Sequence, residues 1–479
     1  MQKTKCYLAA LVSGVLLVTG ILAGYGQSKK NDHLTVYLWE NRLMKNIAPY
    51  IHEQFPDQDI EFIIGNNDTD LYSYFKEHGE LPDIMTVRRF SGTDAQDLQP
   101  YLMDFASYDV VSKYYSYAVE YYKDTDDEIQ WLPICAIPQT IIANKTLFDQ
   151  YGIKVPENYE EYVQVCQQFY DKGIKPYSMD LAEDWSNQEI IQAAAIGEFT
   201  SLDGIDWRNK AETSAGEIKF DDVLWKRIFS ETSQFLKDSH FSKEDINVNI
   251  NTGTQMFVEE KSAMFHGQPT DMQKLQDQMD AELIRIPYFS QTSDSSFVYM
   301  FPSLNIAFNK KLEKNKEKLD TALDVLDCMI SEQGQKLIAD GSGVISLNTD
   351  VPSMMQNVPG LEEEIKDTSI YIRYSAQKSF DASLEAVHGL LSGKMDEMQA
   401  YNAFRSAMNS KDSKEKSTVN FENEYSILLT DTTKSILKKI NPKCAIEQIG
   451  DTTLSSAWIA AMSNGQQPSA PEDYIEVEK

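Results

Sequence analysis

The chain has 479 residues, of which 42% are hydrophobic and 25% are charged, an ordinary globular composition. This length is enough for two or more lobes, each with its own hydrophobic core. The formal net charge is −30. A field of that sign repels phosphate backbones and anionic lipids, so the composition argues against a nucleic-acid partner and against binding to a membrane surface.

The N-terminal residues 1–28 are predicted to be a signal or anchor segment. Lys3 and Lys5 precede an apolar run from Cys6 to Gly24, which is the charged and apolar pattern of a secretory signal. The run is nearly long enough for a membrane span. Export is therefore expected, and contact with the membrane is expected only through this segment.

Alternating strand and helix patterns follow. The strands are expected at 33–39 and 59–64, with a third that follows the segment 79–85, and the helices at 41–55 and 71–78. This order indicates an α/β lobe with a largely parallel sheet. Ligands of such sheets bind beyond the carboxyl ends of the strands, which singles out the loops 39–41, 66–68 and 86–90.

The stretch 131–175 carries the most specific signals. Pro133 and Pro138 bracket a short apolar segment, which indicates an edge or a crossing between lobes rather than a central strand. A buried strand at 140–143 leads to a short helix that ends at Gly152, and an amphipathic helix over 159–170 follows.

The cysteines give no metal or thiol chemistry. They show no CxxC spacing and no close histidine partner, so buried free thiols are expected, with a disulfide pair as the alternative, at Cys6, Cys135, Cys166, Cys328 and Cys444. The sequence also lacks a P-loop, a GxSxG motif, an HExxH motif and a dinucleotide fingerprint. No metal, cofactor or catalytic residue is predicted.

The order of motifs in 131–175 resembles the middle of the extracellular solute-binding proteins of ABC importers, in the family-1, sugar-type, maltose-binding-protein-like class. The segments GELPDIM at 79–85, FVEEKSAMFHG at 257–267 and GSGVIS at 341–346 resemble further motifs of that family. The resemblance covers residues 33–408. The chain departs from the family pattern at Ala143, Tyr159, Glu260 and Ser346, and it lacks the tryptophan that usually follows Gly267.

The resemblance implies a two-lobe periplasmic-binding-protein-like fold of type II, with a hinge between discontinuous α/β lobes. The chain would cross between the lobes three times, placing 33–141 with 285–340 in lobe 1 and 142–284 with 341–410 in lobe 2. Residues 411–463 are interpreted as an extra C-terminal segment or the start of a truncated further domain. The tail 464–479 is polar and is predicted to be disordered.

The resemblance also implies a function. A non-enzymatic, monomeric receptor outside the cytoplasm would capture a carbohydrate, most simply an oligosaccharide, and deliver it to the permease subunits of an ABC importer. Gram-positive members carry a lipidated cysteine where this chain has Tyr25. Three outcomes stay open, namely an uncleaved anchor, cleavage near Gly26, or a replaced cysteine, and all three place the lobes outside the cytoplasm.

A sugar needs aromatic faces for its C–H surfaces and planar polar groups for its hydroxyls. Trp39 and Trp185 are expected to stack on the ligand, whereas Arg88 and Arg89 could donate bidentate hydrogen bonds and could equally favour an acidic sugar. The predicted ligand-binding residues are Trp39, Glu40, Asn41, Asn67, Asp68, Arg88, Arg89, Trp185, His266, Gln268, Tyr371, Arg373 and Tyr374.

Simpler interpretations stand beside these. Trp39 could equally belong to the core, Arg88 and Arg89 to a solvated surface, and His266 to a satisfied polar pair. Two other functions also stay open. A surface-anchored binding or scaffold protein could use the same fold without an importer, and a carbohydrate-active hydrolase would need two carboxylates across a sugar.

Overall fold

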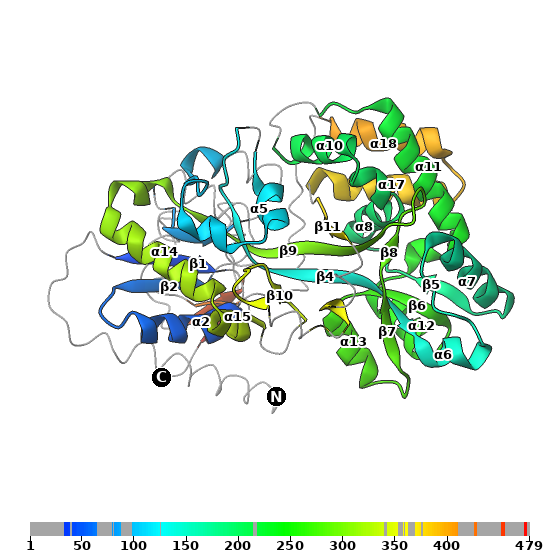
Figure 1. The fold of residues 1–479 in the computed structure, drawn as a ribbon, viewed down its shortest axis with the longest axis horizontal. Coiled ribbons are helices and arrows are strands. Elements are labelled where there is room, and N and C mark those ends of the chain that lie inside the picture. Colours follow the sequence, from blue (N-terminus) through cyan, green and yellow to red (C-terminus); the bar gives the residue numbers. More distant parts are fainter. Residues whose placement is uncertain are drawn as a thin grey trace.

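The computed structural model shows two lobes joined by long strands (Figure 1). The residues that it describes are 33–38, 41–64, 79, 81–87, 98–124, 126–213, 218–339, 343–352, 358, 360–362, 369–374, 377–410, 426–428, 452–455 and 474–476. The predicted signal or anchor segment at 1–28 lies outside this set. No helix among these residues has the length and apolar character that a membrane span requires.

One mixed sheet runs through both lobes. Its main path has the strand order β2-β1-β3-β9-β4-β6-β5. In the first lobe, β1 (Leu34–Leu38) pairs in parallel with β2 (Ile60–Ile64) and with β3 (Ile84–Thr86), as the alternating pattern predicts. The other elements of this lobe are α2 (Asn41–Gln54), η1 (Gln99–Tyr101), η2 (Asp109–Lys113), α5 (Ser116–Tyr122), η4 (Lys310–Lys314), α14 (Lys316–Ile330), α15 (Glu332–Ala339) and β10 (Ile345–Ser346).

Two strands of 13 residues each connect the lobes. They are β4 (Leu132–Asn144) and β9 (Ser296–Phe308), and they pair antiparallel from Leu132 to Gln139. Beyond Gln139, β4 leaves β9 and pairs with β6 (Ser262–Gly267) and β7 (Leu283–Ile286) of the second lobe. The change of partners makes Gln139 the point where the chain passes from one lobe to the other.

Helices cover the sheet in the second lobe, where β5 (Lys175–Ser178) pairs in parallel with β6. The remaining elements of this lobe are α6 (Lys145–Tyr151), α7 (Tyr159–Asp171), α8 (Asp184–Ala194), α9 (Ile196–Phe199), α10 (Leu202–Thr213), α11 (Asp222–Asp238), η3 (Asp245–Asn247), α12 (Ile250–Val258), α13 (Pro269–Gln276), β8 (Tyr288–Phe289), β11 (Ser369–Ile372), α17 (Gln377–Leu391) and α18 (Glu397–Met408). Figure 1 shows α8, α11, α17 and α18 gathered in the upper part of the lobe.

Each lobe has its own core of buried side chains, as a two-lobe protein requires. The first core includes Val36, Leu132 and Phe308, and the second includes Phe169 and Trp225. The described residues between 344 and 361 differ from the predicted segment boundaries, because their buried side chains pack in the first core and not in the second. The reason is that β10 pairs with β4 before the crossing point, so the chain enters the second core only at β11.

Three short strands form a separate sheet near the C-terminus. β13 (Thr452–Ser455) pairs antiparallel with β12 (Ser426–Leu428) and with β14 (Tyr474–Glu476). The last strand lies in the tail 464–479 that the sequence predicts to be disordered. Tyr474 and Ile475 are residue types that favour strands, which accounts for the difference at these positions.

The end of β4 shows how the sequence starts and stops an element. Asn144 is fully buried, and its side-chain Oδ1 accepts a hydrogen bond of 2.9 Å from the backbone N–H of Leu147, which caps the N-terminus of α6. Gly152 ends α6 with φ of 65°, a left-handed conformation that glycine adopts without steric cost. The predicted helix end at Gly152 is confirmed.

Replacement of Asn144 by alanine should lower the free energy of unfolding by about 1 kcal/mol, because the buried N–H of Leu147 loses its acceptor. Urea denaturation followed by circular dichroism measures the change. Asn144→Ser keeps an oxygen acceptor at the cap and should recover part of the loss. Equal stability of the alanine and serine variants would contradict the capping role.

Candidate ligand-binding site

Strand directions bring the loops of both lobes to one place. β3 is antiparallel to β9 with Thr86 opposite Ile306, and β6 is antiparallel to β4 with Gly267 opposite Thr140. The carboxyl ends of β1, β2 and β3 therefore point toward the middle of the crossing strands, and those of β5 and β6 point toward it from the other side. Because ligands bind beyond such strand ends, the site is expected where the two lobes meet.

The predicted first-lobe contacts sit after these strand ends but cannot be placed. Trp39, Glu40, Asn67, Asp68, Arg88 and Arg89 lie outside the described residues. Asn41 is the first residue of α2, and only its backbone is described. Contact of these seven residues with a ligand stays a prediction.

In the second lobe, a buried polar cluster forms around Glu189 of α8. The Glu189 Oε2 atom lies 2.8 Å from Nε2 of His266, and Nε2 of Gln139 donates to the same carboxylate at 3.2 and 3.4 Å. Arg373 forms an ion pair with Glu189 through its NH1 atom. We call Glu189, His266, Gln139 and Arg373 the Glu189 cluster. It joins the first crossing strand, α8, β6 and the segment after β11.

The imidazole of His266 is held on both sides. Its Nδ1 lies 2.9 Å from the hydroxyl of Tyr288 and 3.2 Å from that of Tyr177. Burial lowers the pKa of His266 below its usual range, against the opposing charges of Asp180 and Asp271. In the neutral form that results, the contacts fit an Nε2–H that donates to Glu189 and an Nδ1 that accepts from the two hydroxyls.

The cluster reaches the surface at Arg373. The Arg373 side chain is 15% exposed, whereas those of Glu189 and His266 are 1% and 3% exposed. Its backbone N–H donates to the carbonyl of Met300 at 2.9 Å, and its guanidinium lies 4.3 Å from the ring centroid of Phe301. Since Met300 and Phe301 belong to β9, Arg373 is held directly over the strand that joins the lobes.

Trp185 lies beside this cluster. It is in the first turn of α8, is half-buried, and has its ring centroid 6.4 Å from that of His266. Nearby, burial raises the pKa values of Asp180 and Asp184 above their usual range. The structure therefore brings together three predicted residues from distant parts of the sequence, Trp185, His266 and Arg373.

Tyr371 and Tyr374 are placed differently, with exposed fractions of 1% and 0%. The Tyr371 hydroxyl donates to Oε1 of Gln192 at 2.7 Å, and the backbone N–H of Tyr374 donates to the same oxygen at 3.1 Å. The guanidinium of Arg208 covers the ring of Tyr371 at 4.8 Å. Both tyrosines thus pack in the second core, and neither presents an open ring face to a ligand in this conformation.

Gln268 follows the strand end at which His266 lies. Its backbone N–H donates to Oδ2 of Asp271 at 2.8 Å, which orders the start of α13, and its side chain is half-buried. The structure places it in the second-lobe loop that faces the crossing strands. Its contact with a ligand stays a prediction.

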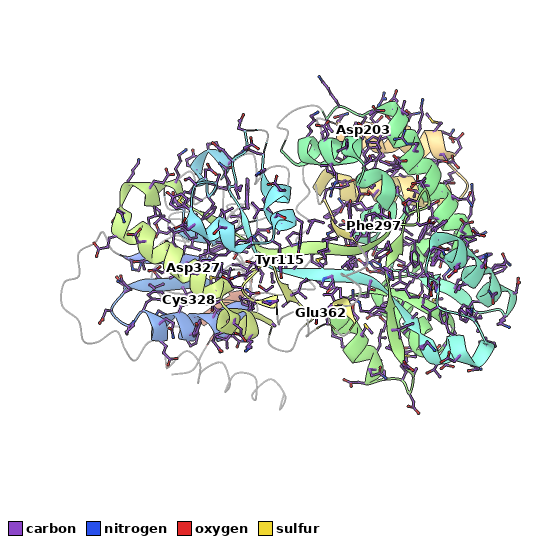
Figure 2. All side chains as sticks on the ribbon, in the orientation of Figure 1. Tyr115, Asp203, Phe297, Asp327, Cys328 and Glu362 are labelled. Carbon is purple, nitrogen blue, oxygen red and sulfur yellow. The ribbon has the colours of Figure 1, made fainter. Side chains whose placement is uncertain are left out.

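Some residues at this place were not predicted. Glu189 and Gln139 carry no local signal, because one lies among other polar residues of α8 and the other in a largely apolar strand. Tyr115 lies between the lobes beside the crossing strands (Figure 2). Its ring stacks on Tyr117 with centroids 5.5 Å apart, and both side chains are half-buried. The stretch 108–122 is rich in tyrosine, and this composition is the only signal in the sequence for the pair.

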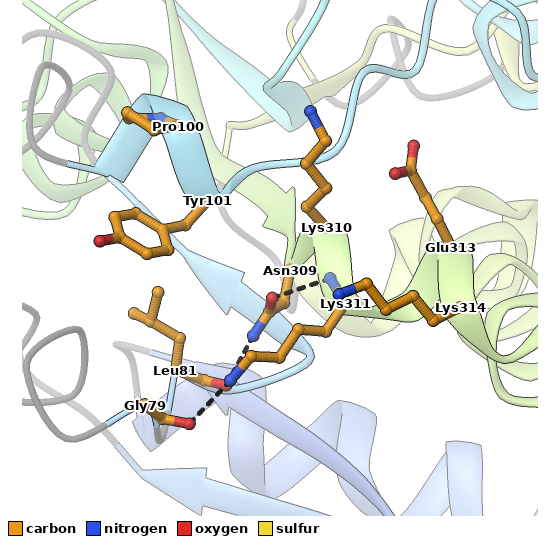
Figure 3. Close-up of a pocket in the computed structure, with 9 residues that line it drawn as sticks. All are labelled: Gly79, Leu81, Pro100, Tyr101, Asn309, Lys310, Lys311, Glu313 and Lys314. Carbon is orange, nitrogen blue, oxygen red and sulfur yellow. Dashed lines mark hydrogen bonds between the residues drawn. The ribbon is translucent and has the colours of Figure 1, made fainter.

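A separate recess of about 340 Å³ lies at the amino end of β3, away from the crossing point. Lys311 Nζ donates to the carbonyl of Gly79 at 2.8 Å on its floor. Figure 3 shows Lys310 and Glu313 extending in the same direction, so the recess has charges of both signs. Its lining includes Tyr101, but all of its lining residues belong to the first lobe, so it does not lie between the lobes.

Among the described residues, no group of three or more His, Cys, Asp or Glu side chains is arranged to hold a metal ion. Cys135 and Cys166 are buried free thiols, as predicted, and Cys328 is a half-buried one. Burial raises the pKa of Cys166 to about 12, which keeps its thiol protonated and unreactive at neutral pH.

The model of the bacterial extracellular solute-binding protein family matches residues 76–367, more than half of the chain. The chain belongs to this family. Members of the family are substrate-binding proteins and not enzymes. The match contains the crossing stretch, α8, β6 and all of β9, so the Glu189 cluster of this solute-binding protein lies almost entirely within it, with only Arg373 beyond its end.

Solved structures and a curated relative agree with this assignment. A multiple sugar-binding protein from Streptococcus mutans is 24% identical over 202 residues, which cover 38% of this chain and 47% of that protein, about half of its length. The apo form of RafE from Streptococcus pneumoniae is 15% identical, with a TM-score of 0.62 over 81% of this chain and 99% of that one. A sugar transporter from Bacillus licheniformis in complex with stachyose is 15% identical, with a TM-score of 0.54 over 78% and 98%. These neighbours show the two-lobe, type II periplasmic-binding-protein fold that the sequence predicts.

Proposed function

We propose that this solute-binding protein captures a carbohydrate between its two lobes and delivers it to the permease of an ABC importer. The observation that carries the proposal is the joint position of Trp185, the Glu189 cluster and the strand ends of both lobes at the crossing point. The relatives and structural neighbours that bind raffinose, stachyose or multiple sugars support a sugar as the ligand. An oligosaccharide is the ligand that we propose.

Each side chain has a proposed part in binding. Trp185 offers a flat apolar face to the C–H surface of a sugar ring, and Arg373 donates hydrogen bonds to hydroxyls. Tyr115 would add a second ring from the first lobe. The first-lobe residues Trp39, Glu40, Asn41, Asn67, Asp68, Arg88 and Arg89 complete the proposed site.

Closure would occur about the crossing segments. β4 and β9 carry the chain between the lobes, and β11 pairs with the start of β9. A few residues at such crossings can absorb the rotation that closes two lobes on a ligand. Gln139 and Arg373 lie on two of these segments and contact the same carboxylate. A rotation between the lobes would therefore move side chains of the proposed site.

The remaining parts of the proposal concern the setting of the protein. The chain acts as an exported monomer at the cell surface, with residues 1–28 as a signal or anchor and the permease as its partner. Residues 411–463 are an additional C-terminal segment. The lobes are made of discontinuous segments, with the third crossing near β11.

Titration of the full chain, kept in mild detergent because of its apolar run at 6–24, against raffinose, stachyose and maltose tests the proposal. At least one sugar should bind and raise the melting temperature by mass action. Trp185→Ala and Arg373→Ala should each lower the affinity by about tenfold or more. Binding is measured by isothermal titration calorimetry.

Tyr170→Ala is the matched control, because Tyr170 is 56% exposed and lies on α7, outside the proposed site. Its affinity should equal that of the unmodified chain. If no sugar of a broad panel binds, the importer function is refuted and the scaffold interpretation is favoured. Release of hydrolysed sugar during the titration would instead indicate a hydrolase.

A further inference from the structure

The Glu189 cluster holds one pair of opposite charges. Glu189 is 1% exposed and contacts the guanidinium of Arg373, the imidazole of His266 and the amide of Gln139. Because burial lowers the pKa of His266, its imidazole is neutral at neutral pH. The carboxylate of Glu189 is therefore the counter-charge of Arg373.

Arginine is the side chain best suited to bind a carboxylate, since its planar fork matches the two oxygens. In this protein, a carboxylate of the chain already occupies the guanidinium from its buried side. A ligand that approaches the exposed side of Arg373 therefore meets hydrogen-bond donors whose positive charge is balanced by Glu189. Such a group suits hydroxyl oxygens and gives little electrostatic gain to an anion.

The charges around the pair act in the same direction. Asp180 and Asp271 are close enough to oppose the loss of charge on His266, and Asp184 lies next to Trp185. Of the three, Asp271 also accepts a hydrogen bond from the backbone of Gln268, in the loop that faces the crossing strands. These carboxyl groups add negative charge, and no positive charge, beside the Glu189–Arg373 pair.

We propose that Glu189 is a specificity-determining residue, which balances the charge of Arg373 so that the cleft takes neutral, hydroxyl-bearing sugars and rejects acidic ones. Glu189 acts through Arg373 and does not touch the ligand itself. The inference rests on the proposed function. It goes beyond that function by naming the charge of the ligand and the residue that selects it.

The test compares neutral and acidic forms of the same sugar. Raffinose, stachyose and maltose are each paired with the uronic acid obtained by oxidation of one primary alcohol to a carboxylate. Calorimetric titration of the full chain should show a preference for the neutral form of about a hundredfold. Glu189→Gln keeps the size of the side chain and removes its negative charge, so the preference should fall by about tenfold or more. Added salt should reduce the gain in affinity that Glu189→Gln gives to the acidic form.

Two further variants keep the test decisive. Glu189→Gln combined with Arg373→Gln removes both charges and should restore the preference for the neutral form, because the effect of one substitution depends on the other. If Glu189→Gln fails to fold, Arg373→Gln alone leaves the Glu189 charge unbalanced and should strengthen the rejection of the acidic form by about tenfold. Glu231→Gln removes a different buried carboxyl of the same lobe and should leave the preference unchanged.

The outcomes separate the two proposals. An unchanged ratio of affinities in Glu189→Gln, or strong binding of the acidic form by the unmodified chain, overturns the role of Glu189 while sugar binding stands. Absence of binding for every sugar, neutral or acidic, overturns the proposed function and this inference with it. If Glu189 had only a structural role, its substitution would lower the affinities for the neutral and the acidic form equally and leave the ratio of the two affinities unchanged.

Discussion

Replacement of Trp225 by alanine is expected to lower the free energy of unfolding by about 3–5 kcal/mol. Trp225 is fully buried in α11, and its ring lies 4.5 Å from that of Trp207, 4.8 Å from that of Phe404 and 5.0 Å from that of Phe220, centroid to centroid. These rings belong to α10, α18 and the chain just before α11. Alanine would leave a cavity at the point where three helices of the second lobe meet.

Urea denaturation of both variants separates this core role from the role proposed for Trp185. Trp185 is half-buried, so Trp185→Ala should cost about 1 kcal/mol or less while it weakens sugar binding. Trp225→Ala should destabilise the second lobe and leave the affinity of the folded protein nearly unchanged. A loss of less than about 1 kcal/mol in Trp225→Ala would contradict the packing described here.

The crossing stretch shows what the sequence could predict about the fold. Pro133 and Pro138 predicted an edge or a crossing rather than a central strand. Both lie in β4, so the crossing is confirmed, but the exclusion of a central strand is wrong because β4 lies between β9 and β6 in the sheet. Pro138 is tolerated because it lies between the pairing of Ala136 with β10 and that of Thr140 with β6, where β4 pairs with β9 on one side only. The amphipathic helix predicted over 159–170 is confirmed as α7, because its apolar spacing depends on local residues alone.

The candidate site was harder to predict because its geometry is set by distant contacts. Glu189 is one of 74 acidic residues, and nothing in its neighbourhood marks it. Its role depends on His266, which is 77 positions away in the sequence. Tyr371 illustrates the opposite case, since the family resemblance implied a sugar contact at its position but pairing of β11 with β9 turns its ring into the second core.

A pair of buried carboxyls outside the Glu189 cluster gives a pH dependence that can be measured. Glu231 of α11 is 9% exposed, and Glu198 of α9 accepts a hydrogen bond of 2.8 Å from Nε of Arg227. Burial and the like charge of Glu198 raise the pKa of Glu231 to about 7, against the opposing charge of Arg227. The folded protein therefore holds a proton on Glu231 that the unfolded chain releases near its ordinary pKa of 4.5.

Stability should consequently fall as the pH rises from about 4.5 to about 7, because the unfolded state then binds fewer protons than the folded one. The loss contributed by Glu231 is on the order of 3 kcal/mol at pH 8. Glu231→Gln keeps a neutral side chain at every pH, so its melting temperature should match that of the unmodified chain at pH 4 and exceed it at pH 8. Glu385→Gln, which changes an exposed residue of α17, should leave the pH profile unaltered. Parallel profiles for Glu231→Gln and the unmodified chain would show that Glu231 is ionised in the folded protein, and the charged pair with Glu198 would then have to be stabilised by Arg227 alone.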